Sequence, residues 1–155
     1  DLFVTQLAAN GATLGFSTFL GGTAEDRGHH LSLADDGEIL LTGRTDSGDF
    51  PVTAGSYDET LGGSRDAFIT VMDGTASNLL YGSYLGGSNE DEGSGILVGP
   101  AGTLILSGST RSADFPATAG AYDTTLNGDY DLYIVKFQFW DNPIVGLFLP
   151  LLRQP

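Results

Sequence analysis

The chain has 155 residues and a formal charge of −14, from 20 acidic and 6 basic residues, and it contains no cysteine. The lack of cysteine excludes disulfides and thiolate metal sites. The negative charge argues against binding to nucleic-acid phosphates or anionic lipid. A hydrophobic content of 41% suffices for a folded core. No apolar run reaches the roughly 20 residues that span a bilayer, and a start at Asp1 suggests a processed product or a fragment.

An internal repeat of 65 residues dominates the sequence. Ser17–Gly22 returns as Gly82–Gly87, and Asp49–Asp58 returns as Asp114–Asp123. Residues 1–65 align with 66–130 without a gap, with 26 identical positions. Such self-similarity is the signature of a repeat architecture.

Each repeat is predicted to hold four short strands. In the second repeat these cover 67–72, 79–85, 96–98 and 103–107, and Gly99–Gly102 makes a tight turn before the last one. The equivalent turn of the first repeat is Ala34–Gly37, which carries the Asp-Gly hairpin signal. Four strands and a long Gly/Thr/Asp connection are typical of a β-propeller blade. A β-solenoid is the alternative.

The predicted fold is therefore all-β, with two four-stranded, propeller-blade-like repeats, an extra strand and a tail. The connections at 45–65 and 110–130 exceed the usual loop length and need their own contacts. Phe50 and Phe115, together with Tyr57 and Tyr122, are the expected anchors on the neighbouring unit. The predicted units are repeat 1 (1–65), repeat 2 (66–130), the first strand of a third repeat (131–139) and an apolar C-terminal tail (140–155).

These motifs resemble the bacterial β-propeller repeat family known as SBBP repeats. The matching pieces lie within residues 1 to about 138, and are Tyr84–Gly87, Glu90–Gly93, Gly102–Gly108, Ser112–Pro116, Ala119–Tyr122 and Asp131–Lys136. The resemblance implies a secreted or cell-surface bacterial protein with tandem repeats and no established catalytic residues. It therefore implies an extracellular location.

Two repeats are too few to close a propeller, which needs 4–8 blades. Open strand edges pair readily with other chains, so we expect an end strand or the tail to complete a sheet in a neighbouring molecule. Covering its own core is the alternative role of the tail. The candidate assembly residues are Asp1, Phe3, Leu7, Asp131, Tyr133, Phe137, Ile144, Leu147, Phe148 and Leu149.

The predicted function is that of a non-enzymatic structural or adhesive subunit that assembles with copies of itself or further repeats into a fibre or ring. The alternative is a fragment of a larger secreted propeller that binds a carbohydrate or protein. The expected partners include no nucleic acid and no membrane span, while a glycan ligand or O-glycosylation fits the Thr- and Ser-rich surface.

The acidic residues give the only candidate metal ligands. Asp26 and Asp91 are equivalent in the two repeats, as are Asp49 and Asp114. Calcium prefers such oxygen ligands, but Asp in Gly-rich loops more often accepts hydrogen bonds from backbone N–H groups. The turn role is preferred, with calcium as the alternative, and no cofactor and no catalytic residue are predicted.

Overall fold

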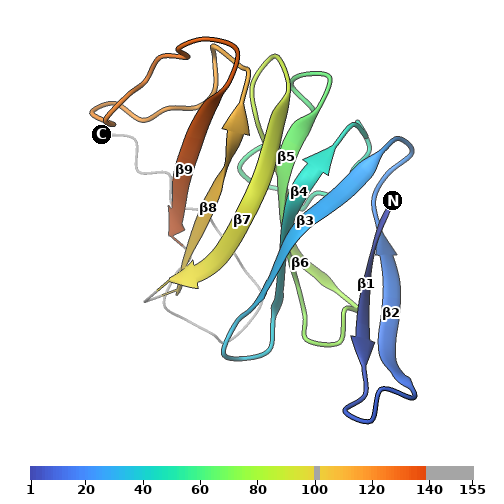
Figure 1. The fold of residues 1–155 in the computed structure, drawn as a ribbon. Helices are drawn as coiled ribbons and strands as arrows, with labels where there is room; N and C mark the ends of the chain where they lie inside the picture. Colours follow the sequence, from blue (N-terminus) through green and yellow to red (C-terminus); the bar gives the residue numbers. More distant parts are fainter. Residues whose placement is uncertain (100–101, 139–155) are drawn as a thin grey trace.

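The computed structural model describes residues 1–99 and 102–138, which form nine β-strands (Figure 1). The all-β class is thereby confirmed. The strands are β1 (Leu2–Leu7), β2 (Leu14–Leu20), β3 (Asp26–Leu33), β4 (Ile39–Thr45), β5 (Asp66–Met72), β6 (Leu79–Leu85), β7 (Asp91–Gly99), β8 (Thr103–Thr110) and β9 (Asp131–Gln138).

The strands form three antiparallel sheets, in the orders β1-β2, β3-β4-β5-β6 and β7-β8-β9. The sequence predicted two sheets of four strands, one from each repeat. Instead, the single four-stranded sheet takes two strands from each repeat. The reason is that β4 and β5 pair in register from Ile39↔Met72 to Thr45↔Asp66, although a long connection separates them. The boundaries of the sheets therefore do not coincide with the boundaries of the sequence repeats.

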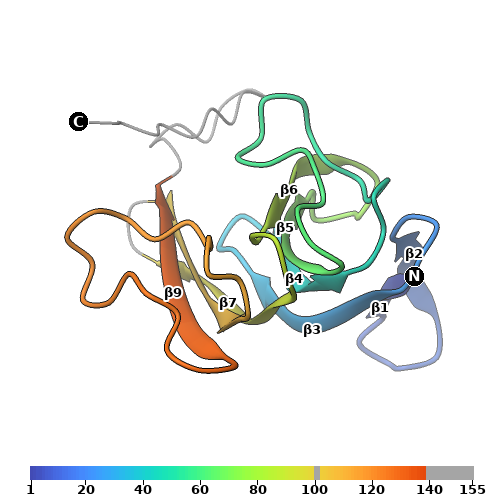
Figure 2. The same cartoon turned by 90° about the horizontal axis from the view of Figure 1, so that it is seen from above.

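The three sheets lie in a row, with the hairpin β1–β2 at one end and β7–β9 at the other (Figures 1 and 2). Strands β4 and β5 and most of β6 are buried in the central sheet, and their successive side chains point to opposite faces. On β5, Ala67 and Ile69 join the core against β7–β9, whereas Phe68 and Met72 join the core against β1–β2.

The connection 46–65 folds back over β6. Phe50 is buried and stacks on Phe68 with ring centroids 4.7 Å apart. Backbone hydrogen bonds run from Thr53 N–H to the Gly82 carbonyl (2.9 Å) and from Tyr84 N–H to the Asp58 carbonyl (3.0 Å). The prediction that Phe50 anchors this segment on the next repeat is confirmed.

Strand β7 begins at Asp91, five residues before its predicted start. Its first half is rich in glycine and serine, which are poor strand formers. Tertiary packing favours the strand nonetheless, because β7 lies against the central sheet and a side chain at Gly93 would collide with Thr42 Oγ1. Gly93 weakens the strand signal in the sequence, and the same residue allows β7 to approach the central sheet closely.

Tyr84 allows a direct test of how the connection is held. Its buried hydroxyl donates a hydrogen bond to the Ser47 carbonyl (2.7 Å) and accepts one from Phe50 N–H (3.0 Å). Tyr84→Phe removes both bonds and leaves these two backbone groups only the longer bond from Phe50 N–H to the Ser47 carbonyl (3.3 Å). Urea denaturation should therefore show a loss of about 0.5–1.5 kcal/mol in unfolding free energy. Tyr122→Phe, at a fully exposed phenol, is the matched control. Equal stability of the two variants would contradict this role of Tyr84.

Candidate functional site

The outer face of the β1–β2 hairpin is open and apolar. Phe3 pairs across the hairpin with Phe19, and their side chains are 71% and 77% exposed. Their equivalents 65 residues later, Phe68 and Tyr84, are both fully buried. Leu7 and Leu14 extend the same face. We call these four side chains, Phe3, Leu7, Leu14 and Phe19, the hairpin face.

The opposite end of the row is open as well. On β9, Leu132 and Ile134 are 88% and 79% exposed. Their equivalents on β5, Ala67 and Ile69, lie in the core between the central sheet and β7–β9. Strand β9 is also a sheet edge, because it pairs only with β8 among the described residues.

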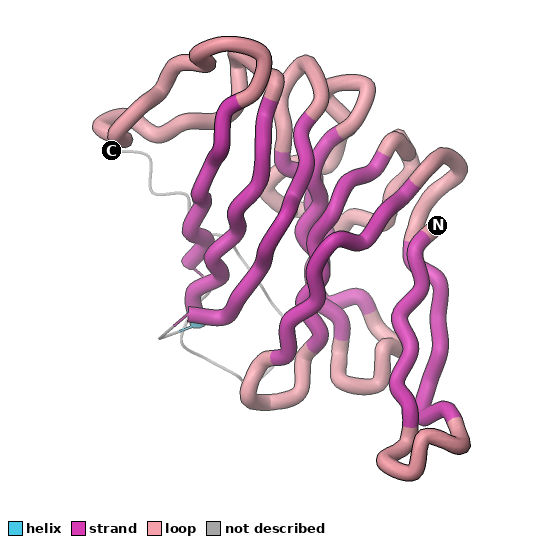
Figure 3. The backbone as a smooth tube through the Cα atoms, viewed as in Figure 1, coloured by secondary structure: helices cyan, strands magenta, loops and turns pink. Residues whose placement is uncertain are grey.

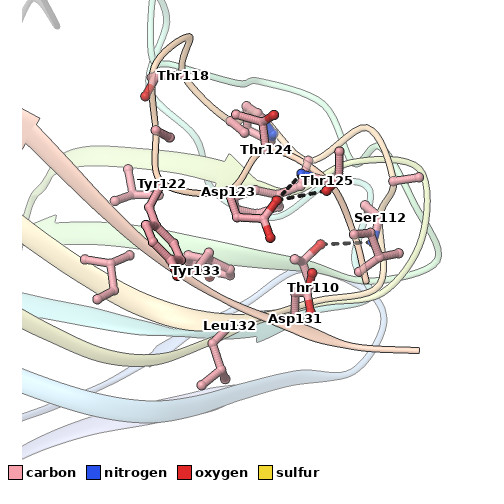
Figure 4. A pocket seen from close by; sticks show the side chains of 18 of the residues that line it. Thr110, Ser112, Thr118, Tyr122, Asp123, Thr124, Thr125, Asp131, Leu132 and Tyr133 are labelled. Atoms are coloured by element: carbon pink, nitrogen blue, oxygen red, sulfur yellow. Dashed lines mark hydrogen bonds between the residues drawn. The ribbon is translucent and has the colours of Figure 1, made fainter. Parts of the chain in front are cut away.

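A groove of about 730 Å³ runs between β9 and the connection that precedes it. Figure 4 shows Tyr133 and Leu132 of β9 on one side and the segment carrying Tyr122 and Asp123 on the other. In the central sheet, the equivalent space beside β5 holds β6. Tyr122, which was expected to be an anchor like half-buried Tyr57, is fully exposed at this groove. Among the described residues, no strand occupies this groove at the position that β6 has beside β5.

The predicted assembly residues fall into distinct environments. Phe3 and Leu7 lie on the hairpin face, and Asp1 is exposed just before it. Tyr133 is buried and stacks on Phe115 with centroids 4.4 Å apart.

The other predicted assembly residues also differ in their surroundings. Phe137 packs edge-on against Tyr57, and Asp131 accepts a hydrogen bond from Asn127 N–H (2.7 Å). Ile144, Leu147, Phe148 and Leu149 lie outside the described residues. Within one chain, then, Tyr133 and Phe137 are packing groups, whereas Phe3 and Leu7 are uncovered.

The four aspartates considered for calcium all hold loops. Asp26 accepts hydrogen bonds from Gly22 N–H (2.9 Å), Thr45 and Ser47, and Asp91 accepts them from Gly87 N–H (2.8 Å) and Ser112.

The second pair joins distant loops in the same way in each repeat. Asp49 accepts hydrogen bonds from the N–H and hydroxyl of Thr23, and Asp114 does so from Ser88. These bonds lower the pKa of both exposed carboxyls. Across the described part of the chain, no three His, Cys, Asp or Glu side chains gather as a metal site.

Asp66 and Asp91 form a buried acidic pair that the sequence analysis did not single out. Both are fully buried, and each has one carboxylate oxygen, Oδ1, without a hydrogen-bond partner among the described residues. They flank Gly86, where a Cβ atom would lie 2.6 Å from Asp66 Oδ1 and 2.8 Å from Asp91 Oδ2. Burial, and secondarily the charge of Asp91, raises the pKa of Asp66 to about 6. The recurrence of Asp at 1, 66 and 131 was the available signal.

The two adjacent histidines lie on β3 and face β7. His29 Nδ1 is 2.9 Å from the Gly93 carbonyl, and His30 Nδ1 accepts a hydrogen bond from Ile96 N–H (3.3 Å). Both residues are exposed side chains at the junction of two sheets. They serve the packing of one sheet on the next.

Comparison with known proteins adds no relative: no family model matches the chain, and no curated protein matches its sequence. The described residues contain no helix long and apolar enough to cross a membrane. The geometry of the open faces, edge and groove is therefore the basis for any functional conclusion.

The acidic pair predicts a pH-dependent stability. Because the folded-state pKa of Asp66 lies above its ordinary value of 3.8, folding favours the protonated form. The stability that this group contributes is present below about pH 4 and is lost as the pH rises through about 6. In urea denaturation, the unfolding free energy of Asp66→Asn should increase relative to that of the wild type as the pH rises across that window, by at most about 3 kcal/mol. A stability difference that stays constant with pH would contradict the assignment.

Proposed function

We propose that this chain is a non-enzymatic structural subunit that assembles with further copies of itself through the open faces and edges of its sheets. The observation that carries the proposal is the contrast between equivalent positions. Phe3 is 71% exposed where Phe68 is completely buried, although both occupy the same place in the same repeat.

Exposed apolar area of this kind favours association. Single exposed apolar side chains are ordinary on protein surfaces, whereas the hairpin face carries two cross-strand apolar pairs, one on each side of the hydrogen-bonded Thr5–Ser17 pair. Such a concentration on one sheet face favours an interaction site. Phe3 and Phe19 are direct cross-strand neighbours, and Leu7 lies opposite Leu14 on the same hairpin. Covering each large side chain contributes about 1.5–3 kcal/mol.

The polar groups support a structural role over a catalytic one. Asp26, Asp49, Asp91 and Asp114 each accept hydrogen bonds from loop groups, so each carboxylate helps to hold the fold. The same arrangement recurs in both repeats, as a structural device would.

Assembly follows the geometry of the row. The two open ends differ, one being a hairpin face and the other a strand edge with a groove. A contact between unlike ends is heterologous and generates rings when it closes and filaments when it does not. The resemblance to SBBP repeats supports placing such an assembly on the cell surface or outside the cell.

Light scattering coupled to size-exclusion chromatography tests the proposal. The average mass of the 155-residue chain should rise with protein concentration, and electron microscopy should show rings or filaments. Phe3→Ser should weaken assembly on the order of tenfold or more, because it removes one apolar group from the contact.

Leu33→Ser is the matched control, since Leu33 is a 64% exposed apolar side chain outside the hairpin face. It should leave the mass distribution unchanged. A chain that stays monomeric at every concentration would contradict self-assembly and would favour a binding module within a larger repeat array.

A further inference from the structure

The two open ends are complementary fragments of the central sheet. Among the described residues, sheet β7-β8-β9 repeats β3-β4-β5 without an equivalent of β6, whereas β1–β2 repeats β5–β6 without equivalents of β3 and β4. Strands β7 and β8 followed by a β1–β2 hairpin would reproduce the complete four-stranded order.

We propose that the β1–β2 hairpin of a second copy of this chain inserts beside β8, where its β1 takes the place of β9 and its β2 fills the groove. The inference rests on the proposed self-assembly and names the surfaces that meet. Strands β1 and β9 are equivalent in the repeat, so the incoming β1 would reproduce the pairing that β9 makes with β8, and β9 of the receiving chain would leave that edge.

The register follows from the pairing of β8 with β9. Ser107 lies opposite Ile134, and Ile105 lies opposite Lys136. Residues 1–7 are equivalent to 131–137, so Ser107 would face Val4 of the second copy and Ile105 would face Gln6 of the second copy. The alternation is kept, since Val4 and Ile134 share one side of their strands.

The exchange covers the hairpin face. Phe3 of the second copy would occupy the buried place of Tyr133 and stack on Phe115, as Tyr133 does at 4.4 Å. Phe19 of the second copy would occupy the place that buried Tyr84 has in the central sheet, beside the Phe50 equivalent. The two largest exposed side chains of the hairpin would thereby be buried beside Phe115, with Phe3 in place of Tyr133.

The groove carries the backbone groups that a fourth strand needs. In the central sheet, Thr53 N–H bonds to β6 at Gly82, and the Asp58 carbonyl accepts from Tyr84. The equivalents of Thr53 and Asp58 are Thr118 and Asp123, which both line the groove (Figure 4). Ser17 and Phe19 of the second copy would supply the matching strand groups.

A second copy suits the groove better than the chain's own C-terminal segment. Residues 144–150 stand 65 positions after β6 and are the competing occupant. They would fill the groove but leave Phe3 and Phe19 uncovered. The inserted hairpin fills the groove and covers the hairpin face in one event, and it replaces β9 at the edge of β8.

Disulfide trapping tests the inference on a clean background, since the chain has no cysteine. Ile105→Cys and Gln6→Cys are made in separate chains, mixed, incubated at high concentration and oxidised. The Cβ atoms of directly opposite residues lie about 4.5–5.5 Å apart, close enough to the roughly 3.5–4.5 Å of a disulfide for a small backbone shift to allow the bond. The mixed disulfide should form on the order of tenfold more than with Thr5→Cys, whose side chain points to the other face of β1.

Ile105→Cys with Lys136→Cys in one chain, which joins a pair already opposite in β8–β9, shows that position 105 can be trapped. Equal yields from Gln6→Cys and Thr5→Cys, or no mixed disulfide, while light scattering still reports assembly, would overturn the inference and leave self-assembly standing. A monomer at every concentration would overturn both. A cross-link that appears only after deletion of 140–155 would assign the groove to those residues and overturn the inference for the intact chain.

Discussion

Strand β5 is stabilised by neighbours on four sides, two paired strands and two packed cores. The arrangement of the other strands follows from this requirement. It pairs with β4 and β6 at its edges, and its alternate side chains enter the two cores on either side of the central sheet. A strand buried on both faces reads as a nearly continuous apolar run, as Ala67–Met72 does. The same sequence pattern at β1 and β9 brings the same requirement, but the part of the chain that the structure describes supplies only some of the four neighbours there.

The phase shift between repeat and sheet explains why the open ends differ. Because each sheet joins the last two strands of one repeat to the first two of the next, any run of whole repeats begins with half a sheet and ends with the other half. Repeat proteins bury their cores only by stacking, and their terminal units are exposed unless capped. Among the described residues, the two ends of the row are the β1–β2 hairpin and strand β9 (Figures 1 and 3), and the groove lies beside β9.

The sequence predicted the strands well and the sheets poorly. Leu79–Leu85 was predicted with its exact bounds, and Ala34–Gly37 is the predicted turn, closed by a hydrogen bond from Gly37 N–H to the Ala34 carbonyl (2.9 Å). These are local signals that propensity and turn residues determine. The pairing of β4 with β5 is not local, since it depends on which strands are buried on both faces, and a repeat aligns equally well at any starting point.

The candidate site was only partly predictable for the same reason. Phe3 and Leu7 were predicted as members of an end strand. Phe19 and Leu14 could be assigned to the same face only once the structure showed them paired with Phe3 and Leu7. The groove is a relation between β9 and a loop, and the Asp66–Asp91 pair joins residues 25 positions apart in sequence. Sequence spacing alone does not show that these groups meet.

The central claim is that β1 lacks neighbours that β5 possesses and obtains them by assembly. Amide hydrogen exchange, resolved by strand and measured from dilute to concentrated protein, tests this most directly. Exchange reports local opening, so strands with complete pairing exchange slowly. We predict that β5 is slow at every concentration and that β1 and β2 become slow only as the mass rises. Exchange in β1 that does not change with concentration while the mass rises would contradict the account.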